Sequence, residues 1–123
     1  MNTLNVYNEI GVYSEVLGAS SHRQIQMLLE KVVTQLTLAI SAIEKNQVPE
    51  KCKLISSANN IVLYMQDCLN FKDTSSIALR LDAIYDHLEK QLFIANARNN
   101  PVILHQCITI VNNILTWWNN VSE

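Results

Sequence analysis

The stretch 81–101 constrains the fold of this chain most strongly. Its apolar residues recur at steps of four, four and three: Ile84, Leu88, Leu92 and Ala95. This spacing places the four side chains on one face of an α-helix, whereas a strand would alternate apolar and polar residues. The stretch therefore predicts an amphipathic helix that buries one face.

The same stretch ends in a break, Asn99-Asn100-Pro101. Asn100 suits the N-cap of a new helix, and Pro101 suits its first position, where the missing N–H removes no hydrogen bond. Because the break is short, it turns the next helix back against the previous one. We therefore predict two antiparallel helices that meet at this corner.

Three further segments show the same helical period. Ser20 and Ser21 cap the first, Pro49 opens the second, and Ser75 or Ser76 caps the third. Four long helices with short connections predict an all-α protein, an antiparallel up-and-down four-helix bundle. The expected helices span residues 21–45, 49–69, 76–98 and 101–121, in a bundle domain that covers residues 20–123.

Residues 1–19 differ from the bundle and form a predicted N-terminal helical arm or cap. Its apolar stripe is interrupted by glycines at positions 11 and 18, each of which costs about 1 kcal/mol in a helix interior. A helix this short is marginal in water by itself. We expect the arm to dock weakly, and the alternative is an ordinary fifth helix packed on the core. The stripe consists of Val6, Ile10, Tyr13 and Leu17, with Tyr7 and Val16 beside it.

The charge balance excludes several classes of function. Nine basic and eleven acidic residues leave a net charge of −2, without the basic stripe of a nucleic-acid-binding protein. The odd number of cysteines, three, without a Cys-x-x-Cys motif favours reduced thiols buried on apolar helix faces. The first residues lack the pattern of a secretory signal. We expect a cytoplasmic protein that binds no nucleic acid.

The segment 101–121 contains no Lys, Arg, Asp or Glu. Its eight polar residues, four of them Asn, oppose insertion into a membrane. Its apolar arc covers more than half of the helical wheel, whereas one bundle seam needs an arc a little over 100° wide. The arm or a partner must therefore cover part of this surface.

Several aromatic and aliphatic residues are candidates for a partner-binding groove. Trp117 and Trp118 lie about 100° apart on the helix, so one is expected in the core and the other at the surface. Tyr85 and Phe93 are expected either at the edge of the core or as an aromatic groove wall. The complete set of candidates is Ile25, Leu28, Tyr85, Phe93, Ile110 and Trp117.

Catalytic and metal-binding patterns are missing from the sequence. The residues three positions before the histidines are Ala19, Ile84 and Val102. None is Glu, so the Glu-x-x-His pairs of di-iron bundles are absent. No glycine-rich phosphate loop and no nucleophile with an orienting partner can be identified. We therefore expect no metal, no cofactor and no enzymatic activity.

Taken together, several motifs look like those of the flagellar secretion chaperones that hold flagellin, the FliS family. Members of that family read Leu-x-x-Leu-Tyr, Leu-x-x-Ala-Asn, a short Asn/Asp break and a late Trp in their last two helices. The arm also contains the apolar-x-x-Tyr pattern, as Ile10 and Tyr13. The chain departs from the family at Ser21, where Pro is usual, and at 28–31, where Leu-Tyr-Asp-Gly is usual. The matching positions are 81–85, Leu92, 95–96, 99–101 and Trp117 or Trp118.

The resemblance implies a cytosolic, non-enzymatic chaperone. Such proteins bind the disordered C-terminal segment of flagellin, prevent its premature polymerisation and present it to the flagellar type III export gate. It also suggests that the arm meets the gate through Ile10 and Tyr13, with Tyr7 and Leu17 as further candidates. Two alternatives stay open: a diverged chaperone with another client, and a structural helical module whose apolar surface forms a homodimer when free.

Overall fold

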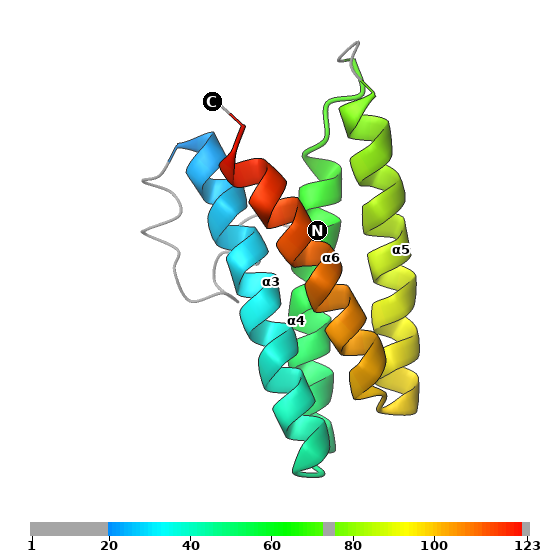
Figure 1. Ribbon diagram of the computed structural model, residues 1–123. Helices are drawn as coiled ribbons and strands as arrows, with labels where there is room; N and C mark the ends of the chain where they lie inside the picture. The colour runs from blue at the N-terminus through cyan, green and yellow to red at the C-terminus, as the bar shows by residue number, and fades with distance from the viewer. Residues whose placement is uncertain (1–19, 73–75, 122–123) are drawn as a thin grey trace.

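Four antiparallel helices make up the part of the chain that the structure describes. The computed structural model describes residues 20–72 and 76–121, and these residues contain no strand. The chain runs down one helix and up the next, as predicted (Figure 1). The all-α bundle is thereby confirmed, and its helices are α3 (Ser21–Glu44), α4 (Val48–Asp67), α5 (Ile77–Arg98) and α6 (Pro101–Asn119).

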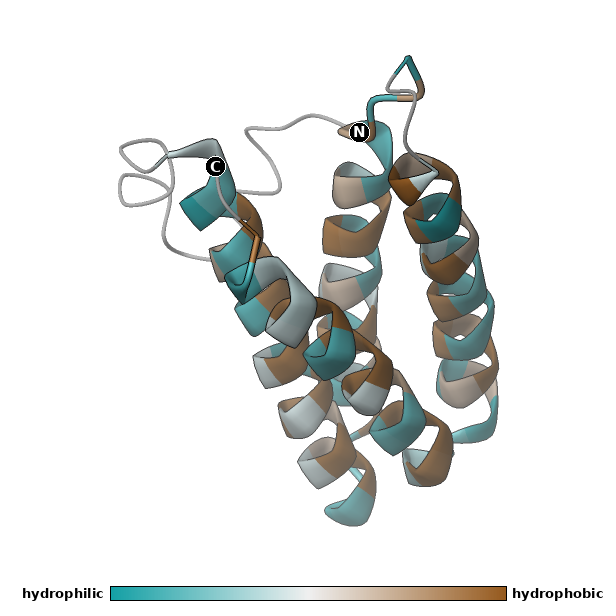
Figure 2. Cartoon of the chain, turned by 45° about the horizontal axis from the view of Figure 1, so that its top comes forward, coloured by the Kyte–Doolittle hydropathy of each residue, from teal (hydrophilic) through white to brown (hydrophobic). Residues whose placement is uncertain are grey.

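The helices form a ring in which each packs against two neighbours. α3 lies between α4 and α6, and α5 completes the ring on the opposite side (Figure 1). Hydrophobic and hydrophilic residues alternate around each helix, so that one face of each turns inward (Figure 2). The fully buried core comes from all four helices and includes Leu28, Leu29, Val32, Leu36, Ile61, Val62, Leu88, Leu92, Ala95, Leu104 and Cys107.

The helix ends follow the capping residues in the sequence. The Ser20 hydroxyl accepts a hydrogen bond from the Arg23 amide at 3.2 Å. The Asn100 side chain accepts hydrogen bonds from the amides of Val102 and Ile103, at 2.9 and 3.3 Å, ahead of the first turn that contains Pro101. Ser76 precedes α5 as predicted, although its side chain makes no capping hydrogen bond.

Two asparagines allow the tight corners between helices. Asn99 and Asn46 are the residues with positive φ in the described ranges, at 50° and 57°, and each lies just beyond the end of a helix. Asparagine tolerates this left-handed conformation better than most residues with a Cβ atom. The predicted corner at Asn99 is therefore confirmed, together with its local cause.

Polar contacts fix α4 against α5 at both ends. Near the start of α4, the ammonium group of Lys51, 3% exposed, donates to the Asn96 carbonyl at 2.8 Å. Near its end, the Gln66 amide donates at 2.8 Å to the carboxylates of Asp82 and Asp86. Two acidic side chains of α5 thus take part in the packing of α4 against α5.

The cysteines differ from the expectation, and the N-terminal arm is not among the described residues. Cys107 is buried and Cys52 is half-buried, but Cys68 is exposed, because α4 ends at Asp67 and leaves Cys68 beyond the apolar face. The expectation that all three thiols are buried was therefore wrong. The arm, with Tyr7, Ile10, Tyr13 and Leu17, lies outside the described residues. No helix within 20–72 or 76–121 combines the length and apolar character needed to cross a membrane.

Candidate binding surface

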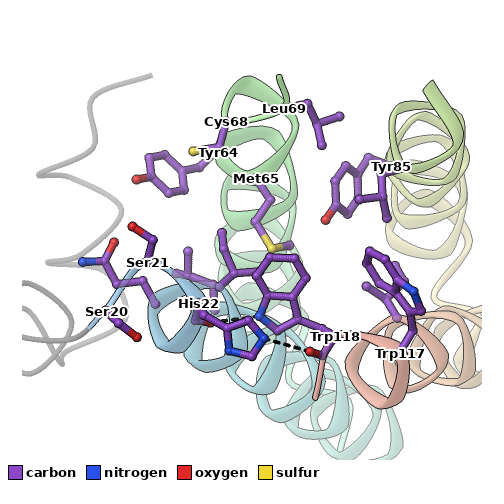
Figure 3. Close-up of a pocket in the computed structure, with 15 residues that line it drawn as sticks. Ser20, Ser21, His22, Tyr64, Met65, Cys68, Leu69, Tyr85, Trp117 and Trp118 are labelled. Carbon is purple, nitrogen blue, oxygen red and sulfur yellow. Dashed lines mark hydrogen bonds between the residues drawn. The ribbon is translucent and has the colours of Figure 1, made fainter. Parts of the chain in front are cut away.

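A cavity of about 790 Å³ opens at the end of the bundle where α3 and α5 begin and α4 and α6 end. We call it the mouth cavity (Figure 3). Every helix contributes to its wall, and none of its lining residues is Asp, Glu, Lys or Arg. It therefore offers an apolar surface with polar but uncharged groups at its edge. Its apolar wall consists mainly of Ile25, Leu28, Met65, Leu69, Leu81, Tyr85, Ile114, Trp117 and Trp118.

One side of the mouth cavity is held by a reciprocal contact between α3 and α6. The Trp118 indole N–H donates to the His22 carbonyl at 2.8 Å, and His22 Nε2 donates to the Trp118 carbonyl at 2.9 Å. Because a carbonyl only accepts, His22 carries a proton on Nε2. The two rings stack with centroids 4.7 Å apart and planes 10° apart (Figure 3). Trp118 is thus fixed as a wall of the mouth cavity.

Tyr85 projects from α5 into the mouth cavity (Figure 3). Its side chain is 3% exposed, and its hydroxyl has no hydrogen-bond partner among the residues that the structure describes. Burial, with a smaller contribution from nearby Cys68, raises the pKa of Tyr85 to about 12. The hydroxyl therefore stays neutral at physiological pH and can exchange a hydrogen bond with whatever fills the cavity.

A second depression, of about 580 Å³, lies between α5 and α6; we call it the α5–α6 groove. It shares Leu81, Ile114 and Trp117 with the mouth cavity, so the two depressions meet at the Trp117 indole. Trp117 is 38% exposed, whereas Trp118 packs against the core, as expected for one inner and one outer tryptophan. The two form one continuous apolar surface. The other residues of the groove are Ile77, Arg80, Ala83, Ile84, His87, Ile110 and Asn113.

The structure brings five of the six predicted groove residues together. Ile25, Leu28 and Tyr85 line the mouth cavity, Ile110 lines the α5–α6 groove, and Trp117 lines both. Phe93 is 76% exposed and lines neither. Phe93 lies about two turns beyond Tyr85 on α5 and is rotated from it by about 80°, and at this position its side chain points to solvent outside both depressions. Whether the other five residues bind a partner stays a prediction.

Sequence reasoning missed several residues of this surface. Leu81 and Ile114 lie on apolar helical faces and were recognisable as interior positions, but nothing local marks them as the shared wall of two depressions. The contact between His22 and Trp118 joins residues 96 positions apart, and neither residue carries a signal for the other. In residues 20–72 and 76–121 no group of three or more His, Cys, Asp or Glu could hold a metal ion.

The fold and the lining of the two depressions define a helical-bundle protein with a continuous apolar surface at one end and between α5 and α6. The family described as "Flagellar protein FliS" matches residues 3–123. The chain therefore belongs to the FliS family of flagellar secretion chaperones.

Curated relatives agree with this assignment. The chain is similar to flagellar secretion chaperone FliS of Vibrio cholerae, with 29% identity over 97% of this chain and 88% of the relative. It is also similar to flagellar secretion chaperone FliSB of Pseudomonas aeruginosa, with 27% identity over 100% and 98%. FliS of Salmonella typhimurium is 28% identical over 97% and 89%. The similarity thus extends over nearly the whole of each chain.

Proposed function

We propose that this protein is a cytosolic export chaperone that binds the C-terminal segment of flagellin, prevents its premature polymerisation and helps to deliver it to the flagellar type III export gate. It does this by binding alone and catalyses no reaction. The observation that supports the proposal most directly is the continuous apolar surface of the mouth cavity and the α5–α6 groove, which meet at Trp117.

The shape of this surface suits a client that folds as it binds. An amphipathic helix lays its apolar face into a groove between two helices of its receptor, with anchors every three or four residues. A disordered client loses conformational entropy on binding, so it can cover a long surface and still dissociate for export. Ile110 and Trp117 lie seven positions apart on α6 and supply two such contacts along the groove.

We further propose that the chain has two parts, an arm over residues 1–19 and a bundle domain over residues 20–123. In the free protein, residues 1–17 cover the mouth cavity, and the client displaces them. Ser20 and Ser21 lie at the edge of that cavity, so the arm leaves the bundle beside it. Such a cover lowers the apparent affinity for a client by the fraction of molecules that are open.

The arm is also the proposed contact with the export gate. Ile10 and Tyr13, with Tyr7 and Leu17 beside them, become accessible when the client displaces the arm. Substitution of Ile10 and Tyr13 by alanine should then reduce recruitment to the gate while client affinity is maintained. Loss of client binding in the same variant would place these residues in the binding surface instead.

Calorimetry with a C-terminal flagellin segment from the same cell tests the main proposal. We expect one-to-one binding together with a gain of helical circular dichroism, and tighter binding when residues 1–17 are deleted. A Trp117→Ala variant should bind much more weakly, whereas Leu38→Ala, a similarly exposed apolar site on α3, should bind normally. Absence of binding in both the full chain and the deletion would indicate a bundle with another client.

Homodimerisation through exposed apolar residues outside the two depressions is the second candidate function. Its support is the exposure of Leu79, Phe93 and Val102, at 66%, 76% and 60%, none of which lines the mouth cavity or the α5–α6 groove. Light scattering of the free protein tests it. A tight dimer that Phe93→Ala dissociates would favour this candidate, and a monomer would exclude it.

A further inference from the structure

We propose that Arg80 determines the specificity of the α5–α6 groove: it selects an amphipathic client helix that carries an acidic side chain on the flank facing α5. This inference rests on the proposed function and adds the charge of the bound helix to it.

Among the described residues that line the groove, Arg80 is the only one with a permanently charged side chain; none of the others is Asp, Glu, Lys or Arg. The opposite wall is α6, whose residues Pro101–Asn119 include no charged side chain of these types. A helix in the groove therefore meets a neutral wall on one side and a single permanent cation on the other. The charge pattern is asymmetric, and it fixes which flank of the bound helix is acidic.

Arg80 is exposed and forms no ion pair or side-chain hydrogen bond within the described part of the chain. The nearby acidic residues of α5 face away from the groove, since Asp82 and Asp86 accept hydrogen bonds from Gln66 of α4. The guanidinium is thus available to an external carboxylate. An arginine can bind such a group through two parallel hydrogen bonds while its alkyl stem lies on apolar surface.

His87 extends the same pattern along the groove. It lies seven positions after Arg80, about two helical turns, and it also lines the groove. A neutral imidazole can hydrogen-bond a carboxylate, and a protonated one adds charge. A client helix with acidic residues at a spacing of seven would therefore match both positions, whereas a helix with a basic flank would place a cation against Arg80.

The same charges disfavour a second copy of this chain as the occupant. In a two-fold dimer through the groove, each Arg80 would face a partner groove without any acidic lining residue. The arm of the same chain is a different case, because Glu9 and Glu15 are its only charged side chains. If the acidic arm occupied the groove, Arg80→Glu would repel the arm and tighten client binding. If an acidic client occupies it, Arg80→Glu weakens client binding.

The test is calorimetry of the full chain with the C-terminal flagellin segment, at low and high salt, for Arg80→Glu and for Lys53→Glu. Lys53 is an exposed lysine on α4 outside the groove, so both variants lower the net charge by two. We expect Arg80→Glu to weaken binding by about tenfold at low salt and by less at high salt, because the interaction is screened. Lys53→Glu should leave the affinity unchanged.

A client-side exchange completes the test. Each acidic residue of the segment is replaced in turn by lysine, and one replacement should restore binding to the Arg80→Glu variant. Normal binding of Arg80→Glu would overturn the inference while the proposed function stands, and failure of the wild-type chain to bind would overturn both. Tighter client binding by Arg80→Glu, or a new dimer in light scattering, would also overturn it, since the arm or a second copy would then be the occupant.

Discussion

His22 and Trp118, 96 positions apart in the chain, each donate a hydrogen bond to the other's backbone carbonyl while their rings stack. The contact closes α6 onto the start of α3 beside the mouth cavity. It holds Trp118 in place, whereas the adjacent Trp117, whose ring centroid lies 5.9 Å away, is left partly exposed. Both tryptophans therefore line the mouth cavity, but only Trp117 also lines the α5–α6 groove.

Replacement of Trp118 by Phe should destabilise the fold. The change removes the indole donor to the half-buried His22 carbonyl, and loss of such a hydrogen bond costs about 0.5–1.5 kcal/mol. The measurement is the free energy of unfolding from urea titration, followed by circular dichroism.

Trp117→Phe is the matched control. Its indole N–H makes no hydrogen bond with another described residue, so we expect a change within about 0.5 kcal/mol in stability. Its effect should appear in client affinity instead. Equal destabilisation by the two variants would mean that the reciprocal contact with His22 contributes nothing measurable.

Lys51→Met tests the polar contact at the other end of the bundle. Methionine keeps most of the aliphatic stem but removes the ammonium group that donates to the Asn96 carbonyl at 2.8 Å. The carbonyl lies in the last turn of α5, and leaving it unpaired costs about 1–3 kcal/mol. Lys53→Met, at an exposed site two positions along α4, should change stability by less than about 0.5 kcal/mol. Urea titration of both variants measures the difference. Equal unfolding midpoints would contradict a stabilising role for the Lys51–Asn96 hydrogen bond.

The limits of sequence reasoning are visible in particular residues. The corner at 99–101, the cap at Ser20 and the four helices follow from local signals, namely apolar period, capping side chains and proline position. The interior of the bundle follows as well, because core positions repeat at steps of three and four. These features depend on neighbours along the chain.

Contacts between distant segments could not be predicted in this way. The residue type of Lys51 predicts a surface position, yet Lys51 is buried, because its ammonium group donates a hydrogen bond to the Asn96 carbonyl at the end of α5. Phe93 reads as a groove residue, yet the rotation of α5 directs it to solvent. Arg80 has the same sequence character as any exposed cation, and its proposed role depends on the neutral wall of α6 across the groove.

Asn99 should be replaceable by Gly but not by Ala. Its φ of 50° and ψ of 47° place it in the left-handed region, where a Cβ atom without a compensating polar group costs about 1 kcal/mol. We expect Asn99→Ala to lower the free energy of unfolding by about that amount. Asn99→Gly should equal or slightly exceed the original stability. If the two variants have the same stability, backbone conformation does not govern this corner.

Alkaline pH should destabilise the protein through two buried groups, Tyr85 and Cys107. Burial raises the pKa of Tyr85 from 10.0 to about 12 and that of Cys107 from 9.0 to about 11. Between pH 9 and 12 the unfolded chain therefore loses these protons while the folded chain retains them. Because fewer protons are then bound by the unfolded state, the free energy of unfolding falls as pH rises through this window.

Below the unfolded pKa values both groups are protonated in both states, so they add no pH dependence there. A rise of this size corresponds to a loss on the order of 2 kcal/mol per group once the window is crossed. Tyr85→Phe removes one of the two ionisations, so its stability should decline less steeply between pH 10 and 12. Urea titrations at about pH 8, 10 and 11.5, which bracket the ordinary pKa of tyrosine, provide the comparison. Parallel declines in the two proteins would show that the Tyr85 hydroxyl ionises as freely in the folded chain as in the unfolded one.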